Sequence, residues 1–365
     1  MVIFFVIIVQ AILVVGHLFV YETWLALAGA RGSGLLALRV ASGVLCFSFV
    51  TATALALRFS NAFVRCFYCL AAAWLGLLNF LVCAACLSWI TYGLARLAGW
   101  RAGGGPIVTG FFSLALVVSV YGVVNAQRIR TQHVALRLPN LPAAWRGRTA
   151  ALVSDLHLGN VHDDAFSRRI VRLLSREQPS IVFIAGDLFD GSRADPRRLV
   201  APWSELVASK GAYFVAGNHE EFARDADFLE AVEGAGIRVL NNQKVVVDGM
   251  QIVGVEHRAT ASPRRFETIL REMRLDPYCA SILLVHSPHR LETAEEAGIS
   301  LQLSGHTHRG QMVPVRWIVE RIFGPFAYGL HRFGRMMVYT SSGAGTWGPP
   351  MRVGTNSEIV LIRFE

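Results

Sequence analysis

The chain has 365 residues, of which 53% are hydrophobic, and a formal net charge of +9. This length leaves room for more than one domain. The first 150 residues hold eleven arginines and a single acidic residue, Glu22, whereas the remainder holds 24 basic and 25 acidic residues. A near-neutral second part argues against nucleic acid as a partner, because nucleic-acid-binding domains carry a basic surface. Arginines confined to short links between apolar segments are typical instead of a membrane protein.

Four stretches in the first part are long and apolar enough to cross a bilayer, which takes roughly 20 residues of helix. They cover about 2–21, 35–57, 66–87 and 107–124. The first is too long for a signal peptide and no basic residue precedes it, so we expect it to be retained. The sequence therefore predicts a transmembrane region of four helices over residues 1–126, in preference to a large buried helical bundle.

The distribution of arginines in the links predicts the orientation of these spans. The links on one side, after the second and fourth spans, carry five arginines: Arg58, Arg65, Arg128, Arg130 and Arg137. The opposite links carry three: Arg31, Arg96 and Arg101. Because positive charge favours the cytoplasmic side, the part after the fourth span is expected in the cytoplasm. Cys279 is the one cysteine of that part, so no cysteine pair points to an oxidising compartment.

The second part is expected to be an α/β layered domain over residues 148–365, joined to the spans by a linker at 127–147. Residues 166–177 carry apolar side chains at the spacing of an amphipathic helix. Asp248-Gly249 is a favoured two-residue turn between two strand-like runs. Strands with helices between them indicate α/β layers.

Five apolar runs of this domain each end in side chains that can bind metals. These side chains are Asp155 and His157 after the first run, Asp187 after the second, Asn218 after the third, His286 after the fourth, and His306 and His308 after the fifth. In open layered sheets, ligands gather beyond the carboxyl ends of the strands. Seven oxygen and nitrogen groups at one place would suffice for two metal ions. Mixed imidazole and oxygen ligands suit Mn, Fe, Zn, Co or Ni rather than Ca or Mg alone.

Taken singly, most of these motifs have ordinary structural explanations. An Asp-x-His pair or a Gly-Asp can be a turn, Gly-Asn is a frequent turn dipeptide, and a lone His after a strand is commonly a core residue. Gly305-His306-Thr307-His308 is the most specific of the five. The ordered occurrence of all five favours a metal centre over coincidence.

The five motifs together resemble those of the calcineurin-like metallophosphoesterases, and the resemblance extends over about 148–365. It implies a four-layer αββα sandwich with a dinuclear centre of two divalent ions, Mn, Fe or Zn first among them. It also implies two ligand groups that share Asp187: Asp155, His157, Asp187 and His308 for one ion, and Asp187, Asn218, His286 and His306 for the other. His219 matches the family histidine that contacts phosphoryl oxygens and protonates the leaving group.

The residues around Gly305–Gln311 are similar to those of membrane-associated or exported bacterial phosphoesterases of the YkuE/YaeI type. This similarity implies a bacterial plasma membrane protein with several spans. Arg309 departs from that branch, where glycine is usual, and either contacts phosphate or faces solvent. Between residues 311 and 336, a loop-like segment rich in aromatic and basic residues either suits the membrane interface or packs on the domain.

The resemblance implies hydrolysis of phosphate ester or pyrophosphate bonds by a metal-activated water. Because four spans would be superfluous for a soluble metabolite, the expected substrate is linked to a lipid, such as a UDP-diacylglucosamine-like molecule. Membrane lipids are expected partners, and nucleic acid is not. The alternatives are a phosphodiesterase of soluble or cyclic nucleotides and a non-catalytic membrane scaffold or sensor.

Overall fold

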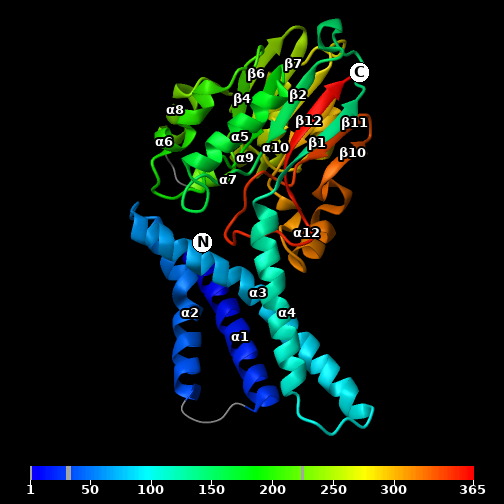
Figure 1. Ribbon diagram of the computed structural model, residues 1–365. Helices are drawn as coiled ribbons and strands as arrows, with labels where there is room; N and C mark the ends of the chain where they lie inside the picture. Colours follow the sequence, from blue (N-terminus) through cyan, green and yellow to red (C-terminus); the bar gives the residue numbers. More distant parts are fainter. Residues whose placement is uncertain (1, 30–33, 223–225) are drawn as a thin grey trace. The chain divides into compact units, whose positions relative to one another are not determined.

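The computed structural model describes residues 2–29, 34–222 and 226–365, which form two compact units. One unit comprises Met1–Asn125 together with Gly348–Val353, and the other comprises Ala126–Trp347 together with Gly354–Glu365. The first contains four long helices (Figure 1): α1 Val2–Ala28, α2 Gly34–Ala56, α3 Ala62–Leu97 and α4 Gly105–Ala126. Each is long and apolar enough to span a membrane, as the sequence predicts.

Polar side chains pair between the helices of the first unit. The Trp74 indole on α3 donates to His17 Nε2 on α1 at 2.9 Å, and the Trp89 indole donates to the Thr23 hydroxyl at 3.0 Å. Such pairing is expected in hydrocarbon, where a polar group has no water to bind.

A short segment from near the end of the chain belongs to the same unit as the four helices. Asn125 Nδ2 donates to the Arg352 carbonyl at 3.0 Å, and the Arg352 amide donates to the Gly122 carbonyl at 2.9 Å. Gly76 on α3 lies against Met351, where a side chain at position 76 would collide with the methionine sulfur. The sequence predicts an uninterrupted domain to residue 365, and here the structure differs.

The second unit contains two six-stranded mixed sheets. The first sheet has the order β1 Ile129–Leu136, β12 Ser357–Phe364, β2 Thr149–Val153, β3 Ile181–Ala185, β4 Ala212–Val215 and β5 Ile237–Val239. The second has the order β10 Gly329–Phe333, β11 Met336–Thr340, β9 Leu301–Ser304, β8 Ser281–Val285, β7 Met250–Val255 and β6 Gln243–Val247. Strands β2 to β5 are mutually parallel, as are β7, β8, β9 and β11.

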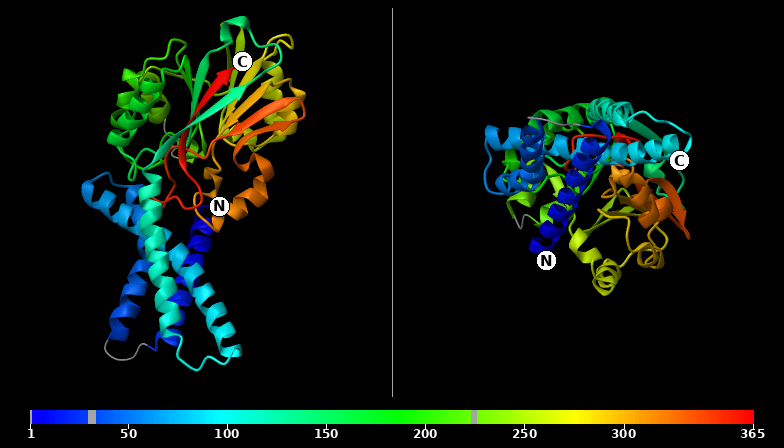
Figure 2. Two further views of the ribbon diagram at one scale, coloured as in Figure 1. Left: turned by 45° about the vertical axis from the view of Figure 1, so that its right-hand side comes forward. Right: turned by 90° about the horizontal axis from the view of Figure 1, so that it is seen from below.

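The two sheets pack face to face and helices cover their outer faces. One buried core contains side chains from both sheets, among them Leu152, Phe183, Ile282 and Leu303. A second core joins the first sheet to α5 Asp164–Glu177, α6 Pro196–Val200 and α8 Ala226–Gly234, and a third joins the second sheet to α9 His257–Thr260, α10 Pro263–Glu272 and α11 Leu291–Glu296. Figure 2 shows these helices, in green and in yellow, on opposite sides of the domain. The predicted αββα layering follows from these three cores.

Two segments differ from the sequence-based expectation. The expected linker at 127–147 contains β1, which pairs in parallel with β12 over its whole length. Its half-exposed sequence, with polar residues at 130–133, lacks the continuous apolar run that marks a buried strand. The expected loop after Gln311 contains the helix α12 Val315–Phe323, which has no buried residue and therefore does not depend on core packing.

Candidate metal centre

The seven candidate ligands follow the ends of five strands. Strands β2, β3 and β4 belong to the first sheet, and β8 and β9 belong to the second. Five of them have a backbone in the left-handed region, with φ between 48° and 71°: Asp155, His157, Asp187, His306 and His308. This conformation costs roughly 1–2 kcal/mol for a residue other than glycine. It turns the chain sharply after β2, β3 and β9, and such strain is concentrated at functional sites.

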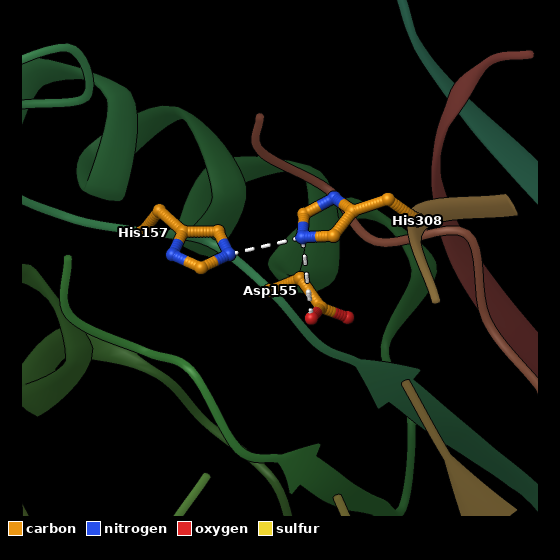
Figure 3. Close-up of side chains that lie close together, drawn as sticks. All are labelled: Asp155, His157 and His308. Atoms are coloured by element: carbon orange, nitrogen blue, oxygen red, sulfur yellow. Dashed lines mark hydrogen bonds and ion pairs between the residues drawn. The ribbon is translucent and has the colours of Figure 1, made fainter. Parts of the chain in front are cut away.

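Asp155, His157 and His308 form the first group of side chains (Figure 3). The Nε2 atoms of the two imidazoles lie 3.0 Å apart, and His308 Nε2 lies 3.5 Å from Asp155 Oδ1. The backbone amide of His306 donates to both oxygens of Asp155, at 3.0 and 3.1 Å. All three side chains of the group are buried.

His286 is the centre of the second group. Its Nδ1 donates to the Ala185 carbonyl at 2.7 Å, so its Nε2 is the atom turned toward the site. That nitrogen lies 3.1 Å from each of three atoms: Asp187 Oδ2, Asn218 Oδ1 and His306 Nδ1. Asn218 and His306 are half-buried, so this side of the centre is accessible.

Asp187 lies between the two groups. Its Oδ2 is 3.1 Å from His286 Nε2 and 3.9 Å from His157 Nε2, while its Oδ1 accepts the backbone amide of His219 at 3.0 Å. A Cβ atom at Gly217 would overlap this carboxylate, which explains why the Asn218 turn begins with glycine. A single carboxylate thus faces both groups, as a ligand shared by two ions must.

The donor set fits divalent cations. In the second group, a neutral His286 would direct a lone pair at the Asp187 and Asn218 oxygens, which also only accept. A positive charge, on His286 or on a bound cation, would stabilise this arrangement. Burial opposes protonation of His286, but the Asp187 carboxylate raises the pKa of this imidazole to about 10. A bound cation would satisfy the same need.

The imidazoles of His306 and His157 are in the neutral state that metal ligation requires. Burial, and next the charge of His286, lowers the pKa of His306 to about 3. Burial and the neighbouring His219 likewise place the pKa of His157 well below its ordinary value. Burial alone would raise the pKa of Asp187, but His286 holds it well below the usual range. Neutral imidazoles and an ionised carboxylate are the forms that bind metals.

His219 stands at the open edge of the first group. Its Nδ1 donates to the Asp190 carbonyl at 3.0 Å, so Nε2 is the ring nitrogen that can take up and release a proton. The His219 ring centroid is 4.7 Å from that of His157. A ligand atom of His219 lies within 4.8 Å of those of His157 and Asp187, so the geometry admits metal ligation as well as the acid role.

Arg309 is partly engaged by its neighbours. Its Nε lies 3.4 Å from Glu320 Oε1, and its guanidinium carbon is 4.3 Å from the centre of the Tyr328 ring. Its backbone φ is +51°, which accounts for the glycine usual at this position in the related branch. The half-buried side chain therefore does not simply face solvent.

The sequence interpretation missed His257. Its ring lies 5.6 Å from that of His286 and 5.5 Å from that of His306, and its buried Nδ1 has no hydrogen-bond partner among the described residues. Burial, and next the charge of His286, lowers the pKa of His257 to about 4. The signal was present, because His257 also follows a buried strand, β7.

Glu220 is a second residue whose role the sequence did not reveal. Its carboxyl accepts the amides of Gly217, Phe189 and Asp187 at 2.8, 2.9 and 3.1 Å. Burial, and then the charge of Asp187, raises the pKa of Glu220 to about 7. Glu220 thus ties together the two turns that carry Asp187 and Asn218.

Comparisons with known proteins agree with this geometry. Residues 149–310 match the family model of the calcineurin-like phosphoesterases. The chain is 32% identical over 268 residues to a transmembrane protein with metallophosphoesterase domain from Danio rerio, covering 68% of this chain and 60% of the relative. It is 29% identical over 263 residues to an uncharacterized metallophosphoesterase of Campylobacter jejuni, covering 70% of each. It is 24% identical over 248 residues to the uncharacterized metallophosphoesterase YkuE of Bacillus subtilis, covering 65% of this chain and 86% of the relative.

The second unit therefore contains a calcineurin-like metallophosphoesterase domain. The resemblance inferred from the five motifs is confirmed. Four long apolar helices precede the domain.

The first prediction concerns the shared carboxylate. Asp187→Asn should reduce the metal content from about two ions per chain to one or none, because Asp187 faces both groups. Elemental analysis of detergent-purified protein measures the content. Asp164→Asn is the matched control, since this carboxylate pairs with Arg198 on the surface of the domain. An Asp187→Asn protein that kept both ions would refute the shared-ligand assignment.

Proposed function

We propose that this protein is a membrane-anchored, metal-dependent phosphoesterase that hydrolyses a phosphate ester or pyrophosphate with a metal-activated water. The observation that carries the proposal is the pair of ligand groups that share Asp187. Two divalent ions held there would supply Lewis acidity and lower the pKa of a water. Mn, Fe or Zn are the ions that the ligand types favour.

The protein's own residues would divide the remaining tasks. The buried ligands Asp155, His157 and His308 fix one side of the centre, whereas the half-buried Asn218 and His306 leave the other side open to a phosphoryl group. His219, oriented by the Asp190 carbonyl, would hold the proton for the leaving group at Nε2. We assign no nucleophilic side chain, because the proposed chemistry uses water.

The second prediction tests the role of His219. His219→Ala should lower turnover by roughly 10²–10⁴-fold, the usual contribution of a general acid, while metal content stays at the wild-type value. His133→Ala, which removes an exposed imidazole on β1, serves as control and should change neither quantity. Loss of metal from the His219→Ala protein would instead make His219 a ligand.

We also propose a substrate linked to a membrane lipid. Helix α4 ends at Ala126 and β1 begins at Ile129, so only two residues separate a predicted span from the first sheet. The three steps from Ala126 to Ile129 span at most about 10 Å. The domain is thereby kept close to the bilayer surface, where a lipid-linked phosphate ester is concentrated. A UDP-diacylglucosamine-like molecule is a concrete candidate.

The third prediction follows from this substrate class. On detergent-purified protein with both ions bound, kcat/KM should be highest for a UDP-linked diacyl lipid, compared with bis(p-nitrophenyl) phosphate, p-nitrophenyl phosphate and a cyclic nucleotide. Chelation should abolish all activity, and the metal should restore it. Preference for the cyclic nucleotide would favour a nucleotide phosphodiesterase. A protein with full metal content and no activity on the whole panel would favour a scaffold or sensor.

We further propose a bacterial plasma membrane location with the domain in the cytoplasm, supported by the excess of arginines in the links after the second and fourth spans. The fourth prediction uses a variant in which Cys279 is the sole cysteine. A membrane-impermeant thiol reagent should leave it unlabelled in intact cells and label it after permeabilisation. Tyr278→Cys in a cysteine-free background is the control, because position 278 is 84% exposed. Labelling of either cysteine in intact cells would place the domain outside.

A further inference from the structure

The chain passes between the two units at three places, and these places lie together on the domain. They are the steps after Asn125, after Trp347 and after Val353. On the domain side, the Ala126 carbonyl accepts the Ser357 hydroxyl at 3.0 Å. Ser357 follows Gly354 by three residues, a reach of at most about 10 Å. The chain therefore enters the domain after Asn125 and after Val353 at the same edge.

Helix α12 is fastened to this same edge. Arg316 Nη1 donates to the Gly354 carbonyl at 2.8 Å. Just before the helix, Gln311 Nε2 donates to the Trp347 carbonyl at 3.2 Å, and the Trp347 amide donates back to Gln311 Oε1 at 2.9 Å. Two of the three crossing points are thus hydrogen-bonded to α12 or to the turn that precedes it.

The outer side of α12 is apolar and exposed. Trp317, Ile318 and Ile322 are 64%, 58% and 67% exposed, and Val315 is exposed as well. At 100° per residue, these four side chains and Arg321 share one side of the helix, whereas Arg316 and Glu320 form an ion pair on the other. We call Val315, Trp317, Ile318 and Ile322 the α12 face.

We propose that the α12 face lies in the interfacial layer of the lipid bilayer. Three observations select lipid as the occupant. The face is apolar with an arginine in its arc, a composition suited to an interfacial helix. Ala126, the last residue of a predicted span, binds Ser357 at the same edge of the domain. Trp347 at a crossing point exposes a further large apolar side chain at this edge.

This placement brings the metal centre to the level of the lipid headgroups. Phe323, which ends α12, contacts the rings of His306 and His289, with centroid distances of 6.5 and 5.2 Å. Trp347 stands edge-on to His219 at 6.2 Å. Both the second ligand group and the proposed acid therefore border the lipid-facing edge. If the proposed function holds, a phosphate ester at headgroup depth enters the centre directly from the membrane.

The fifth prediction tests the docking without reference to activity. The full chain, carrying a benzophenone amino acid at position 318, is reconstituted into phosphatidylcholine–phosphatidylglycerol nanodiscs and irradiated. Mass spectrometry should find lipid adducts at this position at least about tenfold more often than at position 246, because an interfacial side chain contacts acyl chains. Val246 is the matched control, an apolar side chain 61% exposed on β6. Equal adduct yields would overturn the proposal, as would adducts confined to this chain or to a second copy.

A kinetic measurement tests the consequence for the active site and rests on the proposed function. Ile318→Asp combined with Ile322→Asp should lower the rate on a lipid phosphodiester in nanodiscs by about tenfold or more, since charge opposes insertion. The rate on soluble bis(p-nitrophenyl) phosphate should be unchanged, which also shows that the variant is folded. Val246→Asp should affect neither rate. Equal losses on both substrates would contradict the entry from the membrane, whereas a wild-type protein inactive on both would refute only the phosphoesterase assignment.

Discussion

The buried carboxylate of Asp187 is the constraint on which the domain depends. It is ionised, shielded from water, and faces imidazoles from both sheets. An isolated charge in such a place is costly, so it must be paired. The Glu220 carboxyl holds the turn that carries Asp187 and the turn that carries Asn218, because it accepts the backbone amides of Asp187 and Gly217. The left-handed backbone at five of the ligands turns the chain after the strands, so that their polar side chains point at one place.

Each of the two units consists of two segments that are separate in the sequence. Gly348–Val353 leaves the domain after Trp347 and belongs to the unit of the four helices, with Arg352 hydrogen-bonded to α4. The glycines at positions 76 and 122 leave room on the helices for Met351 and Val353. A fragment that begins after residue 126 would therefore lack the partners of this segment, and the full chain is the appropriate object for study.

The arginines of the basic first part and those of the near-neutral domain have different surroundings. The arginines of the first part lie near the ends of the four apolar helices, in the links between them or in the segment after α4, whereas those of α12 lie on a helix of the near-neutral domain. Arg316 is used for attachment to Gly354 and Glu320, and Arg321 remains exposed beside the α12 face. The same residue type thus provides attachment within the domain at Arg316 and lies within the proposed interfacial arc at Arg321.

The sequence by itself determined the four apolar helices, an α/β layered domain and the set of candidate ligands, and the αββα layering was implied by the family resemblance. These features rest on local patterns: long apolar runs, buried strands, and polar residues at strand ends. Only the tertiary structure decided that β1 joins the sheet beside β12 and that 348–353 belongs to the helices, since both depend on residues more than 200 positions apart. Likewise, only the folded structure shows that His257 lies beside two candidate ligands and that the α12 face is exposed. His257 does follow a buried strand, but only folding brings its ring beside the ligands His286 and His306.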